Sequence, residues 1–177
     1  VTITSSYAGA DVSNYNITNQ TSTTANISAK ALTATASASN KVYDGSSAAT
    51  VTLSLSGFIG SETVTSTNSS TFNNKNVGTG KTVTVNSITL ADGSGLAANY
   101  SISAGQTTTA NITAKSLTVS GITASNKTYD GSTNVTLTGT AVYSGLVSGD
   151  TFDGTYTGAF SDKNVGTGKT VTITSSY

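Results

Sequence analysis

Residues 1–7 read Val1-Thr2-Ile3-Thr4-Ser5-Ser6-Tyr7, and residues 171–177 repeat the same seven letters. In both copies Val and Ile alternate with Thr, a pattern typical of a β-strand with one buried face. A fixed internal period decides the architecture of a repetitive chain, so the spacing between such copies is the first property to establish. Here it is 170 positions, from Val1 to Val171.

A second motif halves this spacing. Residues 25–30 read ANISAK and residues 110–115 read ANITAK, an offset of 85 positions. The middle counterpart of the heptad, which begins at Val83, reads VTVNSIT, so the two ends match each other better than either matches the middle. The sequence therefore predicts an array of repeats of about 85 residues in which two kinds of repeat alternate. Within this array, 1–30 is the C-terminal part of one repeat, 31–115 is one complete repeat, and 116–177 is the N-terminal part of the next.

Two longer motifs recur within these units. NKVYDG at 40–45 returns as NKTYDG at 126–131, and KNVGTGKTVT at 75–84 returns at 163–172. Their offsets, 86 and 88, imply insertions of one to three residues, which loops accommodate.

The composition favours strands throughout. The chain has no Cys, His, Met, Trp, Pro or Arg and is crowded with Thr, Ser, Ala, Asn and Gly, which suit strands and turns better than helices. We expect an all-β fold of tandem small β-sandwiches, immunoglobulin-like or related, that follow one another as a rod or fibre. In the complete repeat the expected strands are 31–43, 48–56, 63–72, 81–90, 99–104 and 107–114.

Charge and residue content exclude several classes of function. The net charge is zero and the eight positive charges are all Lys, so no basic surface for nucleic acid or anionic lipid is expected, and no apolar run is long enough to span a membrane. Without His or Cys the usual nucleophile–base pairs and zinc ligands are missing. We expect no enzymatic activity and assign no catalytic, cofactor-binding or metal-binding residues.

Calcium is the one metal ion whose binding the sequence does not exclude. Asp150, Asp153 and Asp162 could bring oxygen ligands together in the last unit. Thr65 and Asn74 stand at the matching positions of the complete repeat, which argues against a site common to all units.

The lysines fall in four repeat-related pairs. Protection of exposed strand edges is the simplest interpretation, because a charge there discourages aggregation. The alternative is a Lys–Asn or Lys–Asp amide crosslink with a catalytic carboxylate, either Asp44 with Asp130 or Glu62 with Asp150. The four pairs are Lys30 with Lys115, Lys41 with Lys127, Lys75 with Lys163, and Lys81 with Lys169.

Three binding motifs are weak. Gly78–Thr82 and its copy Gly166–Thr170 resemble a phosphate loop only superficially, because a strand follows and the first Gly is missing, so we expect a hairpin turn there. Thr-rich runs such as 82–84 leave an ice-binding repeat as a third alternative, although they are short and alternate with expected core residues. Carbohydrate contact through Tyr7, Tyr100 or Tyr156 stays open as an accessory function.

The order of the motifs carries a resemblance. NKxYDG, then KNVGTGKTVT, then NYxI and a closing TxANIxAK strand resemble the YDG-type repeats of large bacterial adhesins and filamentous-haemagglutinin-like exoproteins. The resemblance implies a structural stalk or fibre module of an extracellular, cell-surface adhesin, acting in adhesion, aggregation or biofilm matrix. Some such adhesins carry sugars on Asn-x-Ser/Thr triplets, of which the chain has several, including those at Asn16, Asn26, Asn68, Asn99, Asn111 and Asn126.

The joints between units support a mechanical role. From 24 to 33 and from 109 to 119 there is no Gly or Pro, so one unit passes into the next without a flexible linker. Residues 1–30 have no partner strands of their own repeat, so we expect neighbouring copies to associate head to tail, with strand exchange as one route. Host or matrix glycans are a further possible partner.

Overall fold

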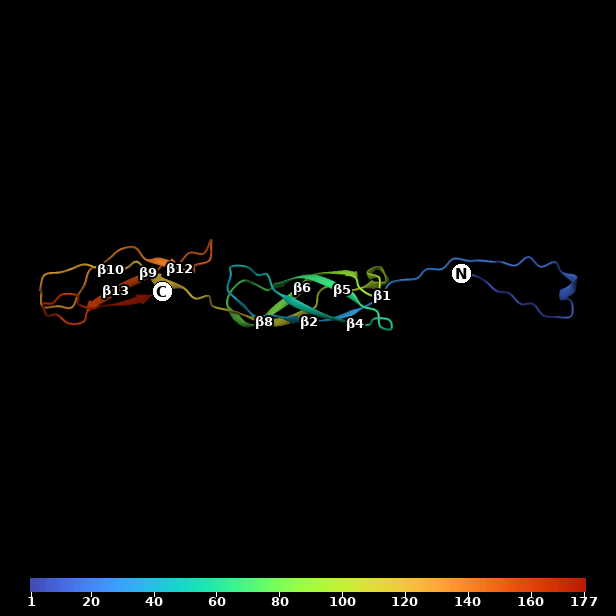
Figure 1. Cartoon of the computed structure of the whole chain (residues 1–177), viewed down its shortest axis with the longest axis horizontal. Helices are drawn as coiled ribbons and strands as arrows, with labels where there is room; N and C mark the ends of the chain where they lie inside the picture. Colours follow the sequence, from blue (N-terminus) through green and yellow to red (C-terminus); the bar gives the residue numbers. More distant parts are fainter.

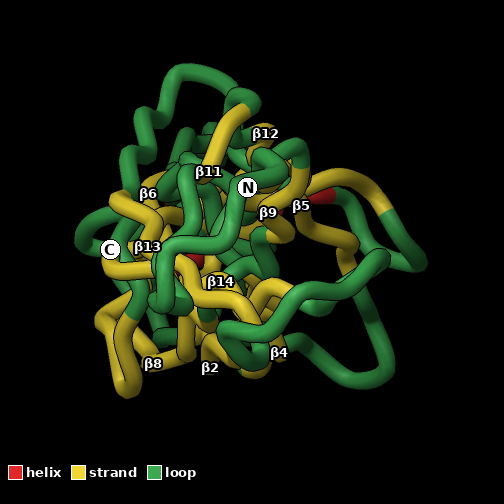
Figure 2. Tube along the Cα trace, turned by 90° about the vertical axis from the view of Figure 1, so that its left-hand side faces the viewer, coloured by secondary structure: helices red, strands yellow, loops and turns green.

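The computed structural model describes all 177 residues and is elongated. An N-terminal segment, a middle body and a C-terminal body follow one another along the long axis (Figure 1). Seen end-on, nearly all regular structure is strand (Figure 2), apart from two helical turns, η1 (Val12–Asn14) and η2 (Ala97–Asn99). No helix has the length and apolar character needed to cross a membrane. The predicted all-β class is confirmed.

The middle body contains eight strands in three sheets. A four-stranded sheet has the order β3-β8-β6-β5, β2 pairs with β4, and β1 pairs in parallel with β7. Most strands lie where the alternation predicted them, but the expected strand 99–104 is reduced to two residues after η2. The strands are β1 (Lys30–Ala31), β2 (Thr33–Ala38), β3 (Lys41–Val42), β4 (Val51–Ser56), β5 (Val64–Phe72), β6 (Gly78–Asp92), β7 (Tyr100–Ser101) and β8 (Thr107–Thr113).

The core of the middle body lies between the β2–β4 pair and the four-stranded sheet. Val83, Val85 and Ile112 are its most deeply buried large side chains, and Val51 and Leu53 of β4 pack against the same cluster. A smaller cluster forms around Tyr100 towards the N-terminal end of the body. Every buried residue of the chain falls between 32 and 112, so this body alone has a closed core.

The C-terminal body repeats part of this arrangement. Its strands form the pairs β9–β12, β10–β11 and β13–β14. The register Phe160↔Val171 between β13 and β14 reproduces Phe72↔Val83 between β5 and β6. Only β13 pairs with β14, whereas β6 is paired on both edges. The strands are β9 (Thr118–Ser120), β10 (Thr123–Ala124), β11 (Leu137–Thr138), β12 (Val142–Ser144), β13 (Thr155–Phe160) and β14 (Val171–Ser176).

The N-terminal segment is a thin hairpin that projects from the middle body (Figure 1). A single bridge joins Thr2 to Ser22, supported by backbone hydrogen bonds from Ile3 N to Thr21 O (3.3 Å) and from Thr23 N to Val1 O (3.2 Å). By the offsets of the repeat, this bridge is the counterpart of the pair Thr84↔Thr107 between β6 and β8. The two arms of the N-terminal segment therefore pair in the same register as β6 and β8 of the middle body, although the other strands of that sheet have no counterpart in the segment.

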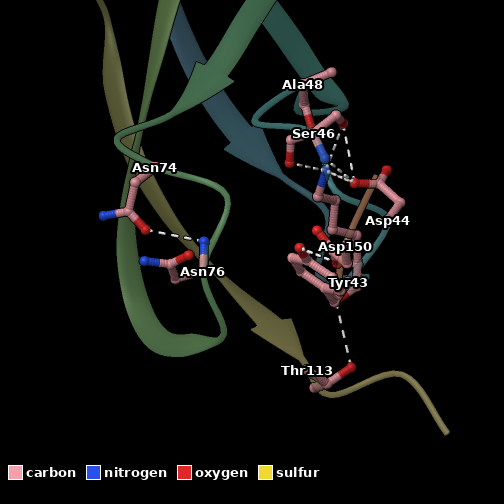
Figure 3. Close-up of polar contacts among 9 residues, drawn as sticks. Tyr43, Asp44, Ser46, Ala48, Asn74, Asn76, Thr113 and Asp150 are labelled. Atoms are coloured by element: carbon pink, nitrogen blue, oxygen red, sulfur yellow. Dashed lines mark hydrogen bonds and ion pairs between the residues drawn. The ribbon is translucent and has the colours of Figure 1, made fainter. Parts of the chain in front are cut away.

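The hairpin turn predicted at Gly78–Thr82 is wrong in position. In the middle body the turn between β5 and β6 comes earlier, where Asn74 Oδ1 accepts a hydrogen bond from Asn76 N at 3.0 Å and closes the chain reversal (Figure 3). Gly78 already pairs with Ile112 of β8, and the register shifts between Gly78 and Lys81. The glycines thus allow a β-bulge, at which Gly80 adopts φ +60°.

Candidate functional site

The junction between the middle and C-terminal bodies is the candidate functional site. The last strand of one body ends at Thr113 and the first strand of the next begins at Thr118, so residues 114–117 alone connect them. A connection this short and free of glycine limits the relative motion of the two bodies.

Three polar side chains meet across this junction. The Tyr43 hydroxyl of the middle body donates a hydrogen bond of 2.6 Å to Asp150 Oδ2 of the C-terminal body (Figure 3). Lys75 Nζ lies 3.4 Å from the other carboxylate oxygen of Asp150 and 6.0 Å from the centre of the Tyr43 ring. We call Tyr43, Lys75 and Asp150 the joint triad.

The three groups of the joint triad stabilise one another's protonation states. The hydrogen bond to the Asp150 carboxylate raises the pKa of Tyr43, because it favours the protonated phenol. The same hydrogen bond, followed by the Lys75 ammonium, lowers the pKa of Asp150, and Tyr43 followed by Asp150 raises the pKa of Lys75. Over the neutral pH range Asp150 is therefore ionised, Lys75 is charged and Tyr43 is a hydrogen-bond donor.

The NKVYDG motif positions Tyr43 at the end of the middle body. Tyr43 N donates to Thr113 O at 2.9 Å, which anchors the residue to the strand that leads into the next body. Directly after it, Asp44 Oδ1 accepts hydrogen bonds from Lys41 Nζ (2.7 Å) and Ser46 N (2.9 Å). These bonds lower the pKa of Asp44 to about 2, with Lys41 as the largest cause.

At the same junction, the backbone of the middle body at Gly45 lies close to the Val147 side chain of the C-terminal body. A Cβ atom built on Gly45 would lie 2.8 Å from Val147 Cγ1 of the C-terminal body, and Gly45 has φ +81°. Glycine is therefore required here for the contact as well as for the turn.

Two of the four lysine pairs, Lys41 with Lys127 and Lys81 with Lys169, bind oxygen atoms within their own units. Lys127 binds Asp130 Oδ1 at 2.8 Å and thereby repeats the contact of Lys41 with Asp44. Lys81 donates to Asn74 Oδ1 at 2.7 Å, and Lys169 binds the equivalent Asp162. Four lysines thus close turns of their own unit through hydrogen bonds and ion pairs.

The carboxylates suggested for calcium do not gather. Asp150 lies in the joint triad, Asp162 binds Lys169, and Asp153 accepts a hydrogen bond from Gly154 N. No group of three or more potential metal-ligating His, Cys, Asp or Glu residues occurs in the structure. Of the carboxylates considered for a crosslink, Glu62 accepts a 2.6 Å hydrogen bond from the Tyr100 hydroxyl, and Asp44 and Asp130 form the ion pairs described above.

The tyrosines considered for carbohydrate contact are dispersed. Tyr100 is buried in the smaller core cluster, the Tyr156 hydroxyl is hydrogen-bonded to that of Tyr143 at 2.7 Å, and Tyr7 lies exposed in the N-terminal segment. They do not form one surface.

Sequence reasoning did not identify the joint triad, although it singled out two of its members for other reasons. Lys75 was paired with Lys163 among the repeat-related lysines, and Asp150 was paired with Glu62 as a candidate carboxylate. The sequence feature that pointed to the triad is that Tyr43 and Lys75 both belong to recurring motifs.

Comparison with known families identifies these units. The YDG domain matches residues 28–110 and, separately, residues 113–177. The chain belongs to the YDG domain family. The two matches meet at the junction described above, so the joint triad connects two consecutive YDG matches. No curated protein and no solved structure matches the chain.

Proposed function

We propose that the chain is a structural stalk module of a bacterial cell-surface or secreted adhesin, in which consecutive YDG units form a stiff rod of small β-sandwiches. In this proposal, residues 31–115 form one complete unit. Residues 1–30 and 116–177 are parts of the units on either side of it. The observation that carries the proposal is the joint triad together with the four-residue connection. Both restrict bending between units, which a spacer must do to hold a binding tip away from a surface.

The shape of the single chain in solution provides the first test. Small-angle X-ray scattering of dilute protein should give an elongated particle with a narrow distribution of conformations. Tyr43→Phe removes the hydroxyl that binds Asp150, so it should broaden that distribution and reduce the mean maximum dimension. Tyr129→Phe is the matched control, because Tyr129 occupies the equivalent place in the C-terminal body and is 58% exposed. A wild-type chain as flexible as Tyr43→Phe would contradict the rod.

Location and ligand require separate experiments. Protease treatment of intact producing cells should remove material recognised by an antibody to the repeat, and persistence of that material in intact but not in lysed cells would contradict a surface position. A glycan array would decide the rival carbohydrate-binding role. Under the stalk proposal, neither the single chain nor its tyrosine variants bind any glycan specifically.

A further inference from the structure

One edge of β5 in the middle body has no partner strand over residues 64–68. β5 is the last strand of the four-stranded sheet, and β6 pairs with its other edge along its whole length. On the outer edge, Ala49 N donates to Ser70 O at 2.9 Å and Phe72 N donates to Ser47 O at 2.8 Å. No strand pairs with this edge before Ser70.

The alternation of the strand decides which backbone groups point outward. Neighbouring residues of a strand direct their N–H and C=O groups to opposite edges. Because Ser70 bonds outward, the even-numbered residues before it also direct these groups away from β6. They are Val64, Ser66 and Asn68, and each offers one donor and one acceptor. The bulge between the two strands does not alter this alternation, since the extra residue, Asn86, belongs to β6.

β5 lacks the features that usually protect such an edge. Charged side chains, proline and bulges on the edge strand discourage pairing between molecules. Residues 63–73 contain no charged residue and no proline, and all eight lysines lie outside this stretch. One side-chain bond reaches across to β4, from Asn68 Nδ2 to Val51 O at 3.0 Å, and it does not use the backbone groups of Asn68.

The corresponding stretch of the C-terminal body is different. By the shared register of the two bodies, Asp153 and Gly154 stand at the places of Thr65 and Ser66. Two copies of that stretch would bring two carboxylates into one ladder, and glycine weakens a strand interior. The unprotected edge is thus a property of the middle body and not of every YDG unit.

We infer that two chains associate side by side through an antiparallel pair of their β5 edges, residues 64–68, with a two-fold axis beside Ser66. Such a contact is isologous, because the same edge serves both copies. Ser66 would form a hydrogen-bonded pair with its own copy, and Val64 would pair with Asn68 of the second chain. The two four-stranded sheets would then continue as one sheet.

The exposed face of this pair is self-complementary as well. Thr65 and Thr67 are both exposed, and in this register each lies opposite the other residue of the second chain. This is the non-hydrogen-bonded type of pair, in which facing side chains are closest and threonine hydroxyls bond to each other.

The direction of the strand determines how the chains would lie. β5 runs roughly along the long axis of the molecule (Figure 1), so paired chains would lie beside each other and not end to end. Stalks joined in this way would form bundles. That role, unlike the pairing itself, rests on the proposed function.

Disulfide trapping tests the register, because the chain contains no cysteine. On mild oxidation, a mixture of Thr65→Cys and Thr67→Cys chains should give mixed dimers well above the statistical proportion, identified by isotope labelling of one variant and mass spectrometry. A mixture of Thr52→Cys and Ser54→Cys is the control, since these exposed residues lie on β4 in another sheet. Equal yields from the two mixtures, or no excess of mixed dimers in the first, would overturn the inference.

Association without crosslinks provides the second measurement. Sedimentation of the full chain over a concentration series should show reversible dimers. Thr65→Asp gives the middle body the residue of its neighbour and should weaken dimerisation by about tenfold or more, because each dimer then carries two added carboxylates at the ladder. Thr52→Asp adds the same charge at an exposed position of β4 and should leave dimerisation unchanged. Equal effects of the two variants would contradict pairing through β5.

The edge pairing and the stalk fail in distinguishable ways. An elongated rod that stays monomeric throughout the concentration series would overturn the edge pairing and leave the stalk intact. A trapped side-by-side dimer whose chains bend freely at the joint, as measured by scattering, would do the reverse.

Discussion

The Lys–Asp turn of the NK-x-YDG motif is the smallest recurring device in the molecule. Lys41 with Asp44 and Lys127 with Asp130 each tie an aspartate to a lysine three residues earlier and to a serine backbone amide two residues later. The turn presents the tyrosine of the motif at the end of its unit. A side-chain hydrogen-bond network, rather than a glycine-rich loop alone, thus positions the residue that reaches the next unit.

Stability should fall as these aspartates are protonated. The lysine partner lowers the pKa of Asp44, and likewise of Asp130, from an ordinary value of 3.8 to about 2 in the folded chain. A lowered folded pKa stabilises the fold above the ordinary pKa, and this stabilisation is lost as pH falls through the folded one. We expect urea midpoints that are constant above about pH 5 and fall from about pH 4 to 2. The double variant Asp44→Asn/Asp130→Asn should show a smaller acid loss, and an equal loss would contradict this assignment.

Gly45 should be irreplaceable for two separable reasons. Gly45→Ala introduces an unfavourable positive φ, at a cost of about 1–2 kcal/mol, and a clash with Val147 across the junction. Gly131→Ala is the matched control, because Gly131 has φ +76° and no atom within 4 Å of a built Cβ. Both variants should lower the unfolding midpoint, but only Gly45→Ala should change the scattering-derived shape. Identical scattering from both variants would exclude a role of Gly45 in the joint.

At the scale of the strand, neighbours decide whether a given sequence is ordered. KNVGTGKTVT forms a bulged strand when β8 lies beside it and an irregular loop when β8 is absent. The alternation of Val and Thr therefore predicted the strands correctly, but it could not predict the bulge. Bulges depend on the partner strand, which is not encoded locally: Ala110, the partner of Lys81 in β8, lies 29 residues further along the chain.

The matched pair Ile112 and Ile27 should show how much the sheet contributes. Ile112→Ala removes a side chain from the closed core and should destabilise the middle body by about 2–5 kcal/mol. Ile27→Ala, in the same Ala-Asn-Ile context, should leave the unfolding midpoint of dilute protein nearly unchanged. Urea denaturation followed by circular dichroism would measure both, and comparable losses would show that the N-terminal segment is already packed in the single chain.

For the whole molecule, the composition predicted the all-β class, and the alternation of apolar and polar residues predicted most strand positions. The joint triad could not be derived in the same way, because Tyr43 and Asp150 are 107 positions apart and belong to different units. Only the orientation of one unit on the next brings them together. That orientation depends on where β8 leaves the sheet and on the length of the following connection, neither of which appears as a residue pattern.

The parallel pairs in the middle body have a consequence for a chain under tension. The incoming strand β1 is bonded in parallel to β7, and β3 to the outgoing β8, through bonds such as Leu32 N to Ser101 O at 2.8 Å. The chain enters and leaves this body at opposite ends (Figure 1). A pull on the two ends would therefore load these bonds in shear, all at once, instead of peeling them apart one by one. Single-molecule stretching should find the middle unit to be the last part of the chain to yield.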